Sequence, residues 1–247
     1  MVIISLTMQH LIRRIFLRRV AAAPECPKSS CPSPERYMEM YHCDAEHVYA
    51  VTLSAELSGS YNSAELGKNL YKEEYGEKQI HVFNSKSASV GETLIALKIA
   101  ECEEKQMSFE EIIKTVDAYI EEQHTYFVLE TLETLKKNGR LTGIKAMMAT
   151  ALNIKPVMGS TPIGSICQLG QGRGMKKAIE KMVAQVKKDA IRPEEKILAI
   201  THCNCPERAE DMKKMVQEQM KVKDIIVLDT AGISSMYAAD GGVILVV

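Results

Sequence analysis

The chain has 247 residues, with 31 Lys and Arg against 32 Asp and Glu, and its net charge at pH 7 is −1. This length can form one large domain or two smaller ones. A charge near zero, without a basic block in the middle of the chain, indicates no nucleic-acid partner. The seven cysteines are scattered and odd in number. That pattern is typical of reduced thiols in a cytoplasm rather than of a disulfide framework.

Residues 1–20 mix apolar side chains with Arg13, Arg14, Arg18 and Arg19. The stretch is too short and too charged to span a bilayer, and its arginines follow the apolar run, whereas those of a signal peptide precede it. We therefore expect a strand followed by a helix and no integral membrane segment. An amphipathic surface helix or an import presequence is the alternative.

Short apolar runs alternate with helical patterns along the rest of the chain. We predict strands within residues 46–54, 79–85, 125–130, 196–202 and 224–229. One helix opens with a capping box of Ser108 and Glu111, and another opens with Pro206 in its first turn. Alternating strands and helices predict an α/β protein with a largely parallel sheet, and the length of the chain favours two domains. We expect an α/β domain with a largely parallel sheet in residues 1–155 and a smaller α+β domain in residues 156–247.

The region around the expected boundary at Pro156 is apolar first and glycine-rich afterwards. Residues 144–159, which include Met147 and Met148, are apolar on nearly every side, so we expect them to be buried or to line an apolar cavity. The sequence GQGRG at residues 170–174 contains Arg173 and resembles a cradle for phosphate or carboxylate. It lacks the Lys-Ser/Thr pair of a P-loop, so a flexible loop is the favoured interpretation.

Three polar clusters lie where a predicted strand or loop gives way to a helix. Ser58 and Gly59 form the first cluster. Ser29, Ser30 and Ser33 form the second, and residues 84–92 form the third. The free N–H groups and positive dipole of a helix N-terminus favour an anion. A single serine there is more often only a cap, as we expect for Ser33 and for Ser87 or Ser89. Two clusters at the first helices of one sheet favour an anion site.

Metal and nucleophile chemistry have weaker support. The sequence HCNC at residues 202–205 contains zinc's preferred ligand types, but it has no partner pair of the C-x-x-C kind, and Cys205 lies where a helix N-cap belongs. We therefore predict no metal site and no catalytic residue. A serine-dependent hydrolase remains an alternative function, although the chain contains no G-x-S-x-G elbow.

Several motifs together resemble one family. The stretches KSSCPSPERYMEMY, TLSAELSGSYNSA, VFNSKSASVGE, FVLETLETLKKNGRLTG, LNIKPVM and THCNCPERAE follow the order and spacing of the DegV family, from about Lys28 to the C-terminus. The resemblance implies a two-domain α/β fold and a cytoplasmic, bacterial carrier that binds a long-chain fatty acid. It also implies that the chain is no enzyme and needs no cofactor, because a separate fatty acid kinase subunit phosphorylates the bound acid.

By the same resemblance, the family's carboxylate-binding hydroxyls fall on Ser29 and Ser58, next to Ser30 and Gly59, and its basic, kinase-engaging loop contains Arg173. The chain departs from the family pattern at both ends. Its N-terminal stretch lacks the usual Asp-Ser-Ser/Thr motif, which leaves a non-functional family member as a further alternative. Near the C-terminus, the family's H-x-G-P-G motif is replaced by DTAGISSMYAADGG, where Thr230, Gly232, Ser234 or Ser235 are candidates for the missing histidine contact.

Overall fold

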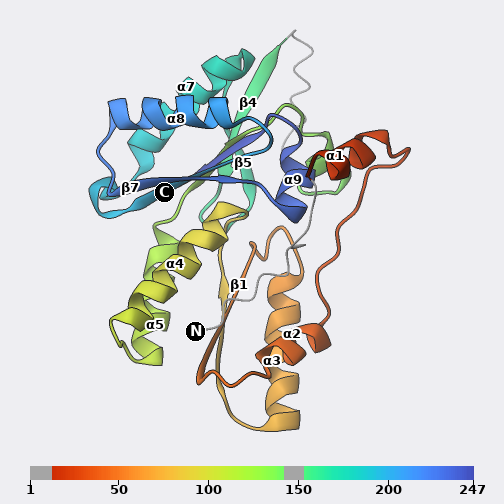
Figure 1. Ribbon diagram of the computed structural model, residues 1–247, viewed down its shortest axis with the longest axis vertical. Coiled ribbons are helices and arrows are strands. Elements are labelled where there is room, and N and C mark those ends of the chain that lie inside the picture. The colour runs from red at the N-terminus through yellow and green to blue at the C-terminus, as the bar shows by residue number, and fades with distance from the viewer. Residues whose placement is uncertain (1–12, 142–152) are drawn as a thin grey trace. The chain divides into compact units, whose positions relative to one another are not determined.

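A computed structural model describes residues 13–141 and 153–247 of the protein (Figure 1). Contacts between residues divide the described chain into two compact units. The first unit comprises Ser30–Gln123 and Pro162–Ser165, and the second comprises residues 13–29, His124–Thr161 and Ile166–Val247. The strand expected at the N-terminus lies outside the described residues, as do Met147 and Met148.

The first unit is built on two parallel strands. Strand β1 (His47–Thr52) pairs with β2 (Gln79–Asn84) in parallel along their whole lengths. Parallel neighbours need a long crossover, and a helix, α3, supplies it. The helices of this unit are α2 (Pro34–Tyr41), α3 (Ser60–Tyr75), α4 (Val90–Glu104) and α5 (Phe109–Glu121).

The helix starts of the first unit follow from local sequence. At α5, the Ser108 hydroxyl accepts the Glu111 N–H at 3.4 Å while the Glu111 carboxylate accepts the Ser108 N–H at 2.9 Å, so the predicted capping box is confirmed. At α4, Ser89 holds the N-cap position, but its side chain makes no capping hydrogen bond. Each start coincides with the polar residues that the sequence offers there.

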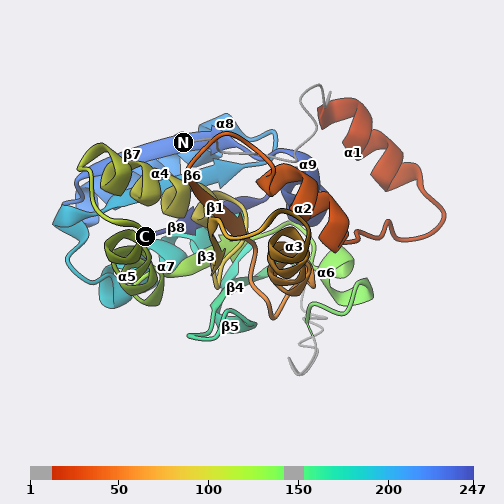
Figure 2. The ribbon, with the colours of Figure 1, turned by 90° about the horizontal axis from the view of Figure 1, so that it is seen from below.

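Helices α2 and α3 lie side by side in both views (Figures 1 and 2). A glycine permits their close approach, because a Cβ atom on Gly67 would lie 2.6 Å from the Pro34 carbonyl oxygen and 2.7 Å from the Tyr37 Cβ. Tyr41 of α2 donates its hydroxyl to the Ala64 carbonyl of α3 at 3.1 Å. This packing fixes the starts of both helices, where two of the serine clusters lie.

The second unit contains a six-stranded mixed sheet with the strand order β5-β4-β3-β8-β6-β7. Among the strands that the structure describes there, only β6 and β7 pair in parallel, and the other pairings are antiparallel. The strands are β3 (Thr125–Val128), β4 (Ile154–Ser160), β5 (Ile166–Arg173), β6 (Ile197–His202), β7 (Asp224–Asp229) and β8 (Val243–Val246). The helices are α1 (Arg13–Ala22), α6 (Glu133–Lys137), α7 (Gly174–Asp189), the 3-10 turn Pro193–Glu195, α8 (Pro206–Gln219) and α9 (Gly232–Ala238).

Both faces of this sheet are covered at its central strands, which explains why β3, β6 and β8 are buried almost throughout. Along β3 the side chains alternate: Tyr126 and Val128 pack with α7 and α8, whereas Phe127 packs with Leu135 of α6 and Ala238 of α9. Helices α7 and α8 lie side by side (Figure 1). The second unit therefore has three layers, with helices on either side of the sheet.

The predicted mixed α/β class and the five predicted strands are confirmed as β1, β2, β3, β6 and β7. The stretch GQGRG differs from the predicted flexible loop, because residues 170–173 belong to β5, which pairs with β4 in antiparallel orientation. Pro156 itself lies inside β4, and the contacts of the chain change unit between Gln123 and His124. The predicted strand at residues 125–130, which was expected in the largely parallel sheet of residues 1–155, is instead the antiparallel neighbour of β4 and β8 in a mixed sheet.

Candidate functional site

The first candidate site lies in the first unit, between the end of β1 and the start of α3. Gly59 occupies the N-cap position of α3 and Ser60 is its first residue. The Ser58 hydroxyl oxygen accepts the Ser60 N–H at 3.2 Å and lies 3.0 Å from the Ser60 hydroxyl oxygen. Ser58 is half-buried and Ser60 is buried. The two serines therefore form one hydroxyl pair at a helix start, where the helix dipole favours negative charge.

Gly59 lets another part of the chain approach this helix start. A Cβ atom on Gly59 would lie 3.4 Å from the Cys31 Sγ, and the Cys31 Sγ lies 3.6 Å from the Ser63 hydroxyl of the first turn. The second polar cluster thus runs directly past the first. Ser30, the residue before Cys31, is exposed in the loop that leads to α2.

The second cluster contains an ordinary cap. The Ser33 hydroxyl accepts the Arg36 N–H at 3.3 Å, and Pro34 is the first residue of α2. The Glu35 carboxylate is bonded by its own N–H and by the Ser33 hydroxyl, which together lower the pKa of Glu35. The prediction that Ser33 caps this helix is confirmed.

In the second unit, Ser29 has a partner that the sequence analysis missed. Its hydroxyl oxygen lies 2.9 Å from the phenol oxygen of Tyr237 in α9. The two residues are 208 positions apart, so no local pattern pointed to their pairing. The only sequence signal was the replacement of the family's C-terminal motif by a stretch that contains Tyr237.

The other C-terminal candidates lie close to Tyr237 in sequence but in different environments. Thr230 and Ser235 are buried, and their hydroxyl oxygens lie 2.9 Å apart. Burial raises the pKa of the Cys203 thiol, and hydrogen bonds from these two hydroxyls partly offset the rise. Gly232 begins α9 with φ at 46°, and Ser234 is half-buried in the same helix. Thr230 and Ser235 thus bond inside the unit.

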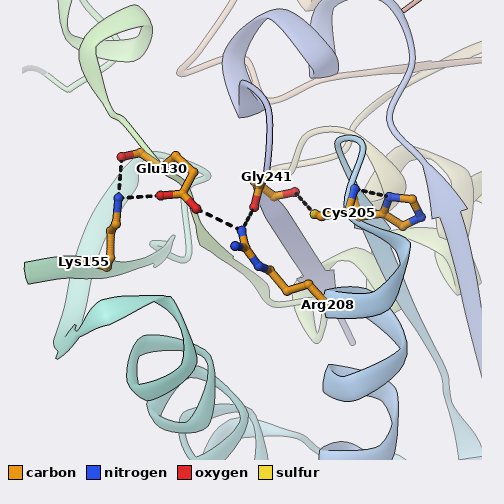
Figure 3. Close-up of polar contacts among 7 residues, drawn as sticks. Glu130, Lys155, Cys205, Arg208 and Gly241 are labelled. Carbon is orange, nitrogen blue, oxygen red and sulfur yellow. Dashed lines mark hydrogen bonds and ion pairs between the residues drawn. The ribbon is translucent and has the colours of Figure 1, made fainter. Parts of the chain in front are cut away.

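The HCNC stretch forms a polar corner at the end of β6. Cys205 stands at the N-cap position of α8, as predicted, and donates its N–H to the His202 Nδ1 at 3.3 Å (Figure 3). Burial lowers the pKa of His202, which favours the neutral ring that can accept this bond. Asp229 lies 3.4 Å from the same nitrogen and pairs with Arg13 of α1. The His202 Nδ1 thus has its hydrogen-bond partner within the chain.

A network of charged side chains is centred on Glu130, in the segment that follows β3 (Figure 3). Lys155 of β4 donates to the Glu130 carboxylate at 2.6 Å and to the Glu130 carbonyl at 2.9 Å. Arg208 of α8 donates to the same carboxylate at 3.1 Å and to the Gly241 carbonyl. The network joins β3, β4, α8 and the turn before β8, so these charges stabilise the unit.

Arg173 is the exposed last residue of β5 and stands at the N-cap position of α7. Gly172 before it permits α7 to pack against the strand, because a Cβ atom there would lie 2.3 Å from the Ala178 nitrogen. Arg173 is therefore exposed at the end of a strand that packs closely against α7. Within the described ranges, no cluster of His, Cys, Asp and Glu could hold a metal ion, and no helix is long and apolar enough to cross a membrane.

Together these features define a mixed α/β protein of two compact units whose serine hydroxyls lie at a helix start and beside a tyrosine. Residues 6–246 match the family model described as "Uncharacterised protein, DegV family". A DegV domain-containing protein of Streptococcus pneumoniae is 32% identical over 230 residues, which cover 93% of this chain and 81% of that protein. The chain belongs to the DegV family.

Two solved structures are especially informative. A DegV family protein of Ruminococcus gnavus, refined with vaccenic acid, is 63% identical, with a TM-score of 0.95 over 98% of this chain and 86% of that one. The fatty acid kinase B3 protein of Streptococcus pneumoniae, loaded with linoleic acid, is 30% identical, with a TM-score of 0.88 over 96% of this chain and 84% of that one.

Proposed function

We propose that this chain binds a long-chain fatty acid and presents its carboxylate to a separate kinase subunit. The observation that carries the proposal is the 63% identity to a protein whose structure was refined with vaccenic acid. The kinase partner is proposed because another relative is a fatty acid kinase B protein. The chain then works in the cytoplasm as a carrier without a cofactor, and the kinase performs the chemistry.

The proposed carboxylate-binding role falls on Ser29 and Ser58, each with its neighbour in the sequence, Ser30 and Gly59. Ser58 supports this role because its hydroxyl lies at a helix start and its bonded partner is another hydroxyl, Ser60. A hydrolase serine would need a histidine base, and the partners of Ser58 and Ser29 are instead Ser60 and Tyr237. These hydroxyls are therefore suited to binding an anion rather than to attacking an ester.

The tail and the carboxylate of such a ligand contribute differently to the free energy of binding. A tail of ~14 to 18 carbons, at ~0.8 kcal/mol per buried CH₂, contributes on the order of 10 kcal/mol before ordering costs. Hydrogen bonds to a charged carboxylate contribute ~1.5 to 3 kcal/mol each. The tail then supplies most of the affinity, and the hydroxyls supply orientation.

Native mass spectrometry of the protein expressed in bacteria tests the binding itself. We expect a copurifying mass equal to that of a long-chain fatty acid, released on denaturation. A protein that carries no lipid, and that takes up none when incubated with vaccenic acid, would contradict the proposal. Turnover of an activated ester by the same lipid-free sample would support the hydrolase alternative.

Arg173 tests the second half of the proposal. Its position at the exposed end of β5 suits contact with a partner or with the transferred phosphate. We expect Arg173→Ala to leave vaccenic acid affinity unchanged and to slow phosphorylation of the bound acid by a cognate kinase. Lys176→Ala, which removes an exposed charge from the first turn of α7, is the matched control. Loss of lipid binding in Arg173→Ala would instead assign Arg173 to the carboxylate.

A further inference from the structure

Tyr237 and Ser29 form a hydroxyl pair within the second unit, with their oxygens 2.9 Å apart. Both residues are half-buried. Two hydroxyls carry two protons, and one proton suffices for the bond between them. Neither hydroxyl has a further partner among residues 13–141 and 153–247. One proton of the pair is therefore available for an acceptor outside the chain.

The direction of the bond decides which proton that is. A phenol is a stronger acid than an aliphatic alcohol, and the stronger acid is the better hydrogen-bond donor. Tyr237 then donates to the Ser29 oxygen, and the Ser29 proton points away from the pair. A carboxylate oxygen, which only accepts hydrogen bonds, is a suitable acceptor for it.

The surroundings hold this pair in place, and a cation lies beside the tyrosine ring. The Arg140 guanidinium lies 5.5 Å from the centre of the Tyr237 ring, a geometry in which the cation is attracted to the ring face. Arg140 is itself directed by a hydrogen bond of 2.8 Å to the Asn138 carbonyl. Asn138 also donates to the Pro27 carbonyl at 3.0 Å, two residues before Ser29. The loop after α6 therefore positions the Ser29 segment and the Tyr237 ring together.

We propose that Tyr237 is a positioning residue for the fatty-acid carboxylate: it orients the Ser29 hydroxyl, while Arg140 holds its ring. The inference rests on the proposed function, because it assumes that Ser29 contacts the carboxylate. It goes further by assigning a role to Tyr237 and Arg140.

Tyr237→Phe is the most direct test, because it removes one oxygen and keeps the ring. Affinities for vaccenic acid and for its methyl ester are measured by isothermal titration. We expect Tyr237→Phe to weaken binding of the acid ~3- to 10-fold, the size of one hydrogen bond, and to leave the ester unchanged. Because Tyr237 acts through Ser29, the double variant Ser29→Ala/Tyr237→Phe should bind the acid no more weakly than Ser29→Ala alone.

Tyr75→Phe is the matched control, since Tyr75 is an exposed tyrosine at the end of α3. Equal weakening of acid and ester in Tyr237→Phe would mean that the phenol only supports packing, and no weakening of either would show that it is dispensable; both results overturn the inference. If the unaltered protein binds neither compound, the proposed function itself fails. If Ser29→Ala weakens only the acid while Tyr237→Phe has no effect, the function stands and the inference falls.

Discussion

Ser33 and Ser58 stand in similar serine-rich stretches at the starts of adjacent helices, yet the structure uses their hydroxyls differently. Ser33 accepts the Arg36 N–H and donates to the Glu35 carboxylate, so both of its bonding capacities serve α2. Ser58 accepts the Ser60 N–H, and its hydroxyl lies 3.0 Å from the Ser60 hydroxyl, which is also hydrogen-bonded to the Tyr37 phenol. A cap thus satisfies its helix internally, whereas the three linked hydroxyls of Ser58, Ser60 and Tyr37 carry one proton more than the two bonds between them need, and we propose that an external anion accepts it.

Ser33 and Ser58 are held at adjacent helix starts by the close packing of α2 against α3. We expect Gly67→Ala to disrupt this packing. The added Cβ would lie within 2.7 Å of both the Pro34 carbonyl oxygen and the Tyr37 Cβ, so the helices must separate. We expect the free energy of unfolding to fall by ~3 kcal/mol, as for overpacking of a tight core. Urea denaturation measures this loss, and it should be accompanied by weaker lipid binding.

Gly170→Ala is the control for that experiment. Nothing lies within 4 Å of the Cβ position at Gly170, so the same chemical change is expected to be nearly neutral there. If Gly67→Ala is as stable as Gly170→Ala, the close approach of α2 and α3 does not contribute to stability.

A third helix start sharpens the comparison through its pH dependence. Glu92 lies in the first turn of α4, and burial raises its pKa to about 7, partly offset by a hydrogen bond from the Ser89 backbone. Because the folded state binds this proton more tightly than the unfolded chain does, the stabilisation is fully present below pH ~4.5 and is lost as the pH rises towards 7.

We therefore expect the unfolding free energy of the protein to fall by on the order of 2 kcal/mol more than that of Glu92→Gln between pH 4.5 and 7.5. Glu35→Gln is the matched control, because hydrogen bonding lowers the pKa of Glu35 and gives the opposite sign. Denaturation curves at several pH values measure both. Parallel pH profiles for the protein and Glu92→Gln would be inconsistent with a raised pKa at Glu92.

The smallest expected effect concerns the cap itself. Ser33→Ala should lower the free energy of unfolding by ~1 kcal/mol, the usual cost of losing a helix cap. Ser33→Asp keeps an acceptor for the Arg36 N–H and should restore most of this loss. Thermal denaturation distinguishes the two variants. Equal melting temperatures for Ser33→Ala and Ser33→Asp would show that the Ser33 hydroxyl does not stabilise the helix as a cap.

The sequence predicted what local chemistry determines. The capping box of Ser108 and Glu111, the cap at Ser33 and the helix start at Pro206 all depend on residues within one turn of each other. The buried strands were recognisable because apolar runs of their length stand out between helical patterns.

Long-range packing determined what the sequence could not predict. The glycines of β5 resemble those of a loop, but Gly172 lies in a strand where the close packing of α7 leaves no space for a Cβ atom. The pairing of Ser29 with Tyr237 joins residues 208 positions apart. A resemblance named Ser29, but only the fold could show which hydroxyl lies beside it.

The central claim is that the Ser58 hydroxyl binds the carboxylate of the fatty acid. The ratio of the affinities for the acid and for its ester tests this claim most directly. Vaccenic acid and its methyl ester share a tail and differ in charge, and their affinities would be measured for the protein, Ser58→Ala and Ser33→Ala. We predict that Ser58→Ala weakens the acid ~10-fold relative to the ester, while Ser33→Ala leaves the ratio unchanged. If Ser58→Ala weakens acid and ester equally, or changes neither, the Ser58 hydroxyl serves only the start of its helix and the account is contradicted.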